Sequence, residues 1–371
     1  MCIQYVGRMF RTWFGFSLGI CLLLPASLLA QRSFPHPSIQ LHDVKFKPAE
    51  PIHRGTIGQL FNVNGHTVAL PSTSTQINSL SFSQDGKLLV AGKQHGRVVV
   101  WDVASKAVIS VIDTGFPAVG RVAISPDNQF IAAATRSGPS IKLWHIPDGQ
   151  PAGTIDNTHA NVLQLIYAQT NLLIVFSGST DEFDTISGRL VRSFHGEQTP
   201  VLSNDGSTLV TVKDSNLILR NTRDWAIERT LPKLVSPERP VFWDTSQGVF
   251  LFQDITDDHV FVAARTNDGQ LAPGDKLANL PKSSVPFEDF ANMDPHTGLV
   301  FGHSGGELWA LDLRTGKTCL SPQLLSNSGT LSPDGRLLAG AMEPAIPTDN
   351  QNDAGVFIWK TEDLAKACHM Q

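Results

Sequence analysis

The chain has 371 residues, of which 29 are Lys or Arg and 34 are Asp or Glu, so its formal net charge is −5. Charged residues make up 17% of the sequence, below the roughly 25% of an average soluble protein, and 30 Gly with 23 Pro indicate a compact chain rich in turns. This composition excludes collagen-like and broadly disordered chains. Nucleic acid is not an expected partner, because phosphate binding requires a basic surface.

The first thirty residues have the layout of an export signal. Arg8 and Arg11 precede a stretch without charges that runs from residue 13 to Ala30. We expect residues 1–30 to be a signal peptide cleaved after Ala30, so that the mature chain is periplasmic or extracellular. The same 18 uncharged residues are just long enough to cross a bilayer, so an uncleaved N-terminal membrane anchor remains an alternative.

Residues 31–76 are rich in Pro, His, Ser and Thr, which predicts an extended arm in front of a domain that spans residues 77–371. Within the arm, the alternating segments 57–63 and 66–70 flank Asn64-Gly65, a dipeptide that favours a β-hairpin. We expect these strands to pair with the last repeat and to close the domain.

A short phrase recurs after residue 76 with a period of about 40 residues. It is a turn of the type Ser-x-Asp-Gly that begins at Ser83, Ser125, Ser203 and Ser332, and the longer intervals leave room for three unmarked copies. An apolar run, a second turn and a run ending in an aromatic residue follow each marked turn, as expected for short antiparallel strands. Seven copies of four strands predict an all-β fold, a seven-bladed β-propeller of four-stranded antiparallel blades.

The repeats resemble those of a WD-repeat β-propeller, in a degenerate form of the exported bacterial type. Trp101-Asp102 gives the WD dipeptide once, and degenerate versions stand at Trp144, Trp309 and Trp359. The resemblance implies a network in each blade that connects a His, a turn Asp, a Ser or Thr and the Trp by hydrogen bonds.

No copy in this chain carries that whole network. His95 and Ser137 stand at the turn Asp position in the first two copies, and the fourth copy has Asp214 but Arg220-Asn221 in place of Trp-Asp. We therefore expect blade cohesion to come mostly from apolar packing between sheets.

Residues 310–320 resemble the tryptophan-docking motif of quinoprotein propellers, which would imply a pyrroloquinoline quinone site. The motif occurs once, and Leu320 stands where that family has a Trp. The segment Arg-Thr-Gly-Lys within it is also an ordinary hairpin turn. We therefore expect no cofactor.

Two acidic clusters and a group of histidines are candidate metal sites. The clusters are Asp181, Glu182 and Asp184, and Asp254, Asp257 and Asp258 with His259; the histidines are His36, His42, His53 and His66. The two acidic clusters do not have the spacing of a calcium-binding loop, and the histidines do not have the spacing of a tetrahedral metal site. The sequence contains no Gly-x-Ser-x-Gly motif, so it points to no serine as a catalytic nucleophile. We thus expect no catalytic, cofactor-binding or metal-binding residues.

Cys319 and Cys368 are the cysteines that remain after signal cleavage, and their matching positions in two successive repeats argue against a disulfide. Two long insertions, 343–352 and 267–285, are loops on which binding often resides.

These features predict a binding scaffold and not an enzyme. We expect an exported, monomeric propeller that binds a protein or a component of the cell envelope, with membrane contact only if the signal is uncleaved. The alternative is an extracytoplasmic propeller enzyme, lactonase-like or quinoprotein-like, with a metal or quinone in its central channel.

Overall fold

The structure is a computed structural model, and every residue that it describes lies in the compact unit Arg32–Gln371. The described residues are 39–41, 60–63, 66–69, 77–135, 138–156, 161–176, 179–214, 216–232, 238–244, 249–254, 261–267, 270–276, 291–304, 307–312, 318–320, 325–342 and 356–369. The expected signal peptide, and the larger part of the arm, lie outside these residues.

The described strands form seven four-stranded antiparallel sheets and one two-stranded ribbon. Sheet 1 contains β4 (Ile77–Phe82), β5 (Leu88–Lys93), β6 (Arg97–Asp102) and β7 (Ala107–Asp113). Sheet 2 contains β8 (Arg121–Ile124), β9 (Phe130–Ala134), β10 (Ser140–His145) and β11 (Pro151–Asp156). Sheet 3 contains β12 (Gln164–Ala168), β13 (Asn171–Phe176), β14 (Ser179–Phe183) and β15 (Leu190–His195).

Sheet 4 contains β16 (Gln198–Leu202), β17 (Thr208–Lys213), β18 (Asn216–Asn221) and β19 (Ile227–Pro232). Sheet 5 contains β20 (Glu238–Asp244), β21 (Val249–Asp254), β22 (Phe261–Asn267) and β23 (Gln270–Lys276). Sheet 6 contains β24 (Ala291–Asp294), β25 (Leu299–Ser304), β26 (Glu307–Asp312) and β27 (Thr318–Leu320). Sheet 7 contains β28 (Leu325–Leu331), β29 (Leu337–Met342), β30 (Val356–Lys360) and, on its outer edge, β1 (Ile39–Leu41).

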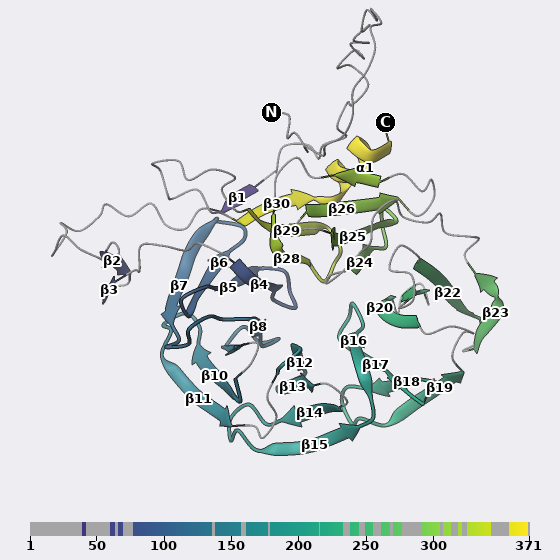
Figure 1. Cartoon of the computed structure of the whole chain (residues 1–371), viewed down its shortest axis with the longest axis horizontal. Helices are drawn as coiled ribbons and strands as arrows, with labels where there is room; N and C mark the ends of the chain where they lie inside the picture. The colour runs from purple at the N-terminus through teal and green to yellow at the C-terminus, as the bar shows by residue number, and fades with distance from the viewer. Residues whose placement is uncertain are drawn as a thin grey trace, which may run out of the picture. The chain divides into compact units, whose positions relative to one another are not determined.

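The sheets lie around a common centre, with the first strand of each sheet innermost (Figure 1). Neighbouring inner strands are in contact around much of the ring, including β28 with β4, β4 with β8, and β20 with β24. The expected all-β propeller of four-stranded antiparallel blades is therefore confirmed. Part of the expected loop 267–285 is strand, because Gln270–Lys276 is the outer strand β23.

The hydrophobic core lies between neighbouring sheets, as expected from the sequence. One buried cluster joins sheets 1 and 2 and includes Val90, Val100 and Ile131, and another joins sheets 2 and 3. A middle strand is covered on both faces, which explains why β5 is an unbroken buried run and β13 reads Asn-Leu-Leu-Ile-Val-Phe. The outer strand β15 is mostly exposed, and its composition is more polar.

The strand that completes sheet 7 is β1, which pairs antiparallel with β30 through Ile39↔Ile358 and Leu41↔Val356. The sequence-based expectation that residues 57–70 pair with the last repeat is wrong. That segment forms its own hairpin of β2 (Leu60–Val63) and β3 (His66–Ala69) around Asn64-Gly65. The N-terminal arm still completes the last sheet, but with an earlier and shorter strand.

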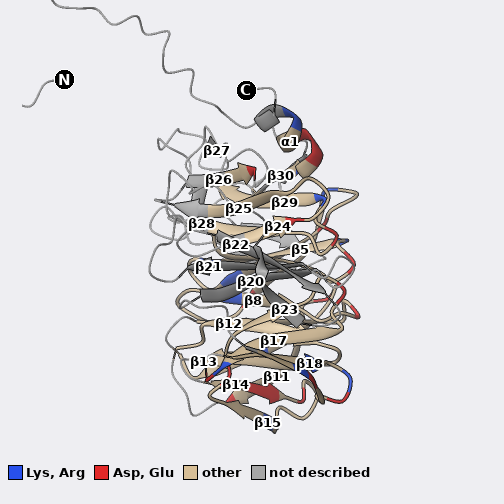
Figure 2. Ribbon diagram, turned by 90° about the vertical axis from the view of Figure 1, so that its right-hand side faces the viewer, with Lys and Arg blue, Asp and Glu red and all other residues tan. Residues whose placement is uncertain are grey.

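The last described residues form a helix, α1 (Thr361–His369), where the fourth strand of the last copy was expected. Because β1 already occupies the outer position of sheet 7, this segment has no strand to pair with. Leu364 and Ala365 pack into the core between sheets 6 and 7, and the Lys366–Glu362 pair spans one helical turn at 2.7 Å. Figure 2 shows these charges in blue and red on the ribbon of α1.

A buried ion pair stabilises sheet 4, in addition to the expected apolar packing. Arg220 Nη2 donates to Glu197 Oε1 at 2.7 Å, and Thr211 Oγ1 donates to Glu197 Oε2 at 2.8 Å. Glu197 is 2% exposed. Burial by itself would raise the pKa of Glu197, but the hydrogen bonds from Arg220 and Thr211 outweigh it and hold the pKa below its ordinary value.

The same arginine connects sheet 4 to sheet 3. Arg220 Nη1 donates to the carbonyl oxygen of Trp225 at 2.8 Å, and its guanidinium carbon lies 5.1 Å from the centre of the Phe194 ring, at the end of β15. The ion pair therefore takes the place of the hydrogen-bonded network that the family resemblance implies.

Sheet 1 carries the Trp of the WD dipeptide without this network. In sheet 1 Trp101 pairs with Leu89, and at the equivalent position of sheet 4 Arg220 pairs with Leu209. Two residues further along the same strand, Ala91 of sheet 1 therefore lies where sheet 4 has Thr211. Among the described residues, the buried Trp101 Nε1 has no hydrogen-bond partner. Sheet 1 is accordingly held by apolar packing, as expected from the sequence.

We predict that β1 is required for full stability. A chain that begins at His42 loses three paired residues that a chain beginning at Arg32 keeps. At about 1 kcal/mol for each hydrogen bond and roughly 2–4 °C per kcal/mol for a large domain, its Tm should fall by about 5–10 °C. Calorimetry on the two chains measures this, and equal melting temperatures would contradict the closing role of β1.

We predict that Arg220→Ala destabilises the protein by about 3–5 kcal/mol, because it leaves the Glu197 carboxylate buried without its partner. Because the folded-state pKa of Glu197 is depressed, its contribution is present above the ordinary glutamate pKa and is lost as the pH falls through the folded-state pKa. The stability difference between wild type and variant should therefore shrink at acid pH.

Urea denaturation at several pH values measures both effects. Arg223→Ala, which removes an exposed arginine from the turn after β18, is the matched control and should change stability by less than about 0.5 kcal/mol. Equal effects of the two substitutions would argue against a stabilising ion pair.

Candidate functional site

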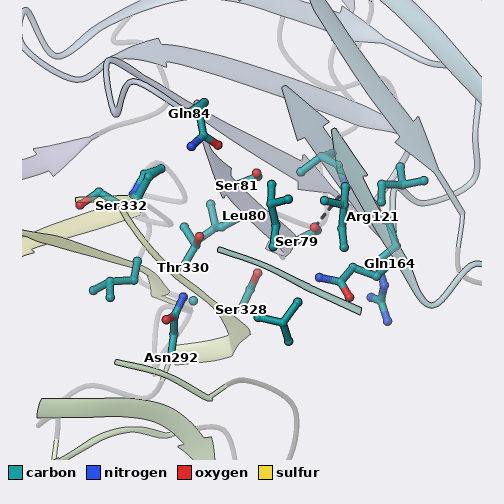
Figure 3. A pocket seen from close by; sticks show the side chains of 18 of the residues that line it. Ser79, Leu80, Ser81, Gln84, Arg121, Gln164, Asn292, Ser328, Thr330 and Ser332 are labelled. Atoms are coloured by element: carbon teal, nitrogen blue, oxygen red, sulfur yellow. Dashed lines mark hydrogen bonds between the residues drawn. The ribbon is translucent and has the colours of Figure 1, made fainter. Parts of the chain in front are cut away.

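The inner strands surround a central cavity of about 520 Å³. Its described lining comes from β4, β8, β12, β16, β24 and β28 and from the turns that follow several of them (Figure 3). This volume falls within the range of about 300–1,000 Å³ that is usual for small-molecule sites. The cavity is therefore the candidate site that the fold itself creates.

The four repeated Ser-x-Asp-Gly-type turns share one geometry and follow the ends of inner strands. In the first, Ser83 Oγ donates to Asp85 Oδ1 at 2.7 Å and accepts from the Leu88 N–H at 2.9 Å. The same pair of bonds recurs in the turns that begin at Ser125, Ser203 and Ser332. Gly86 and Asn128 have φ of 69° and 59°, which explains the Gly and Asn at this position.

These turns narrow one end of the cavity. Gln84, in the turn after β4, donates from Nε2 to the carbonyl oxygen of Asn204 at 3.3 Å, although Asn204 belongs to the turn after β16 in sheet 4. Asn128 Nδ2 donates to Asp85 Oδ2 at 3.1 Å and joins the first two turns. Hydrogen bonds to Asp85 outweigh its partial burial and lower its pKa to about 2, so the carboxylate remains ionised.

The lining is polar and mostly uncharged. Its polar side chains are mainly the amides and hydroxyls of Asn78, Ser79, Ser81, Gln84, Gln164, Asn204, Asn292, Ser328, Thr330 and Ser332. These groups can both donate and accept hydrogen bonds. One such bond inside the lining joins the Val122 N–H to Ser79 Oγ at 3.2 Å.

Arg121 is the one charged side chain among the described lining residues. It begins β8, at the opposite end of the inner strand from the narrowing turns. Its Nη1 donates to the carbonyl oxygen of Gly120 at 2.8 Å, and its Nε donates to the carbonyl oxygen of Leu163. Two backbone contacts from adjacent sheets thus hold the guanidinium at the cavity wall.

Sequence analysis did not nominate these lining residues. A partial signal existed, because Ser79 and Ser81 alternate with the core residues Leu80 and Phe82 along β4, as on a strand with one polar face. The cross-ring contact between Gln84 and Asn204 has no signal in the sequence.

The first acidic cluster is structural. Asn171 Nδ2 and Trp225 Nε1 donate to the buried Glu182 Oε1 at 2.7 and 2.9 Å, and Ser193 Oγ donates to Asp181 Oδ1. Hydrogen bonds from the hydroxyl and the N–H of Ser187, in the turn between β14 and β15, lower the pKa of Asp184. Across the part of the chain that the structure describes, no three His, Cys, Asp or Glu side chains come together as metal ligands do.

Other sequence-based candidates lie wholly or partly outside the described residues. The side chains of Asp254, of residues 257–259, of the four arm histidines and of Cys319 and Cys368 are among them, as is the insertion 343–352. In the segment 310–320, β26 and β27 pair antiparallel through Trp309↔Leu320, as a hairpin does. No helix of the described chain is long and apolar enough to cross a bilayer.

One buried tyrosine, Tyr167, lies on the inner strand β12 but is not among the residues that line the central cavity. Burial raises the pKa of Tyr167 on β12, and its hydroxyl is enclosed in the core between sheets 2 and 3. A neutral, enclosed phenol does not provide the ionised group of a reaction centre.

Residues 58–102 match the family model described as WD domain, G-beta repeat, and the match ends at Trp101-Asp102, the end of β6. A stretch of 77 residues is 31% identical to the small ribosomal subunit protein RACK1 of Medicago sativa and covers 21% of this chain and 23% of that protein. The chain thus matches less than a quarter of that relative's length. The chain is thus a β-propeller in which one segment matches the WD domain, G-beta repeat family.

Proposed function

We propose that this protein is a non-enzymatic binding scaffold that engages another protein through the rim of its propeller. The observation that carries the proposal is a short run of exposed apolar side chains in β15 and the turn before it, at the outer edge of sheet 3, which we call the β15 patch. It consists of Ile186, Leu190 and Val191, which are 88%, 55% and 49% exposed. Clustered apolar side chains on a surface are typical of protein contacts.

The position of the β15 patch suits a protein partner. β15 is the outer strand of its sheet and pairs with β14 among the described strands, so its other edge is available for main-chain hydrogen bonds. The neighbouring outer strands β11 and β19 contain Pro151 and Pro232, which weaken an edge as a pairing surface, whereas β15 contains no proline.

We further propose that the seven sheets form one closed, seven-bladed ring and that the protein is a monomer. The contacts of β28 with β4 support closure because they join the first and last sheets, and the pairing of β1 with β30 supports it because chain that precedes sheet 1 completes sheet 7. A closed ring gives the rim a fixed geometry, which suits a scaffold.

We also propose that the protein is exported and acts at the cell envelope or outside the cell. The support is the order of Arg8, Arg11 and the uncharged stretch that ends at Ala30.

We predict that the protein isolated from its native compartment has the mass of residues 31–371. Intact-mass spectrometry measures this. A chain that retains residues 1–30 in a membrane fraction would instead support the anchored form.

We predict that Leu190→Ser with Val191→Ser weakens partner binding by at least about tenfold, because each buried aliphatic side chain contributes about 1.5–3 kcal/mol. Cross-linking of the tagged protein in its native cells, followed by affinity measurement on the recovered partner, tests this. Ile227→Ser is the matched control, since Ile227 is 53% exposed but lies on β19. Equal partner recovery by wild type and the double variant would contradict the proposal.

A further inference from the structure

We propose that the protein partner docks on β15 by strand addition, through an extended segment in which acidic and apolar residues alternate. This interaction rests on the proposed scaffold function and assigns a chemistry to the partner. Three features of β15 support it, which are its edge, a bulge in its pairing with β14 and the charges of two arginines.

β15 has an available edge at the rim of the ring. It is the outermost strand of sheet 3 (Figure 1), and among the described strands it pairs with β14, from Ser179↔His195 to Phe183↔Leu190. In an antiparallel ladder about half of the residues direct their backbone N–H and C=O groups away from the paired neighbour. β15 has six consecutive residues without proline or glycine, so it can pair with one further extended strand.

A bulge separates the side chains of β15 by their chemistry. Leu190 pairs with Phe183. The next pair joins Arg192 to Glu182, so β15 has one extra residue between the two pairs. Phe183 packs into the core between sheets 2 and 3, whereas Glu182 accepts a hydrogen bond from Trp225 of sheet 4. Paired residues point to the same face, so Leu190 lies on the side of sheet 2 and Arg192 on the side of sheet 4. An added strand that alternates apolar and acidic residues matches both faces.

The charges along β15 favour an acidic segment. With histidine counted as neutral, the charged side chains at the surface between residues 184 and 195 are Asp184, Arg189 and Arg192, one negative and two positive, with a formal charge of +1. Arg192 is 41% exposed, and its Nε lies 3.6 Å from the buried Glu182 Oε2, which is longer than an ordinary hydrogen bond. Its guanidinium can therefore donate to a carboxylate of an added strand.

The same charges argue against a second copy of this chain as the partner. Two copies joined symmetrically along their β15 edges would bring Arg189 and Arg192 of both copies to one short interface. Like charges on paired strands are destabilising. A different protein with an acidic extended segment avoids this repulsion, in agreement with the proposed monomer.

Three peptides with blocked ends probe the edge of β15. The acidic probe is Thr-Val-Glu-Val-Glu-Val-Thr, and the basic probe has Lys in place of both Glu residues. The methylated probe is the acidic sequence with a methyl group on the backbone nitrogen of every residue between the two Thr residues. Fluorescence polarisation of the labelled peptides with the full chain at low ionic strength measures binding, because salt would screen the arginines. We expect the acidic probe to bind about tenfold or more tightly than each of the others, since one reverses the charges and the other lacks main-chain donors.

Hydrogen exchange distinguishes strand addition from a contact of side chains alone. An added strand accepts hydrogen bonds from the outward-directed N–H groups of β15. A saturating concentration of the acidic probe should therefore slow the exchange of these amides by about tenfold or more. Exchange in the neighbouring outer strand β19 should stay unchanged.

Two variants test the side chains. Arg189→Glu should weaken the acidic probe by about fivefold or more and strengthen the basic probe, because it turns an attraction into a repulsion. Arg223→Glu reverses an exposed arginine in the turn after β18, so it is the matched control and should change neither. Leu190→Ser with Val191→Ser should weaken the acidic probe by about tenfold or more, because it removes the apolar contacts.

Tighter binding of the acidic probe, its weakening in Arg189→Glu and slower exchange in β15 would support strand addition. Binding of none of the probes, equal binding of the acidic probe and either of the others, or unchanged exchange in β15 would overturn it.

This proposal and the scaffold function can fail separately. A partner recovered from cells in a manner that depends on Leu190 and Val191, without binding of the acidic probe, would retain the scaffold function and overturn strand addition. Binding of the acidic probe with slower exchange in β15, together with equal partner recovery by wild type and the double variant, would support strand addition and contradict the scaffold function.

Discussion

The structure depends on one constraint, which is that each four-stranded sheet must bury both faces of its middle strands. A single sheet cannot do this, because nothing covers its second face. Every described core cluster accordingly spans two neighbouring sheets, as the cluster with Val90, Val100 and Ile131 does. Covering each sheet by the next one requires radial repetition, and that repetition brings the first strands together around a central cavity.

Radial packing makes the junction of the first and last sheets the critical point of the ring. The apolar cluster that joins sheets 1 and 7 contains Ile77 and Leu80 from β4 and Val356 and Ile358 from β30. β1 then pairs with β30, so the chain before sheet 1 completes sheet 7. This arrangement explains why the C-terminal segment is released from strand pairing and forms α1, which covers the core between sheets 6 and 7 instead.

The sequence predicted the repeated part of the fold because each repeat carries its own local signals. The turns at Ser83, Ser125, Ser203 and Ser332 have the same hydrogen bonds, so the repeated phrase marks a repeated structure. The hairpin at Asn64-Gly65 was also predicted, since that dipeptide favours such a turn.

The parts that sequence analysis missed depend on contacts between distant residues. β1 has three residues, too few for an alternating pattern, and its strand pairing is set by β30 more than 300 residues later. The Glu197–Arg220 ion pair stands in place of the hydrogen-bonded network of His, Asp, Ser or Thr and Trp that the family resemblance implies. A search of the sequence for His and Trp therefore cannot find it. The cavity combines side chains from six repeats, and no single repeat contains a recognisable site.

Two arginines illustrate how the same side chain connects neighbouring sheets at different places in the fold. Arg220 donates two hydrogen bonds to a buried carboxylate, so the pair is neutral and contributes to sheet cohesion. Arg121 donates to the carbonyl oxygens of Gly120 and Leu163, which ties the start of β8 in sheet 2 to the residue before β12 in sheet 3. Polar contacts between neighbouring sheets thus add to the apolar packing that the fold requires.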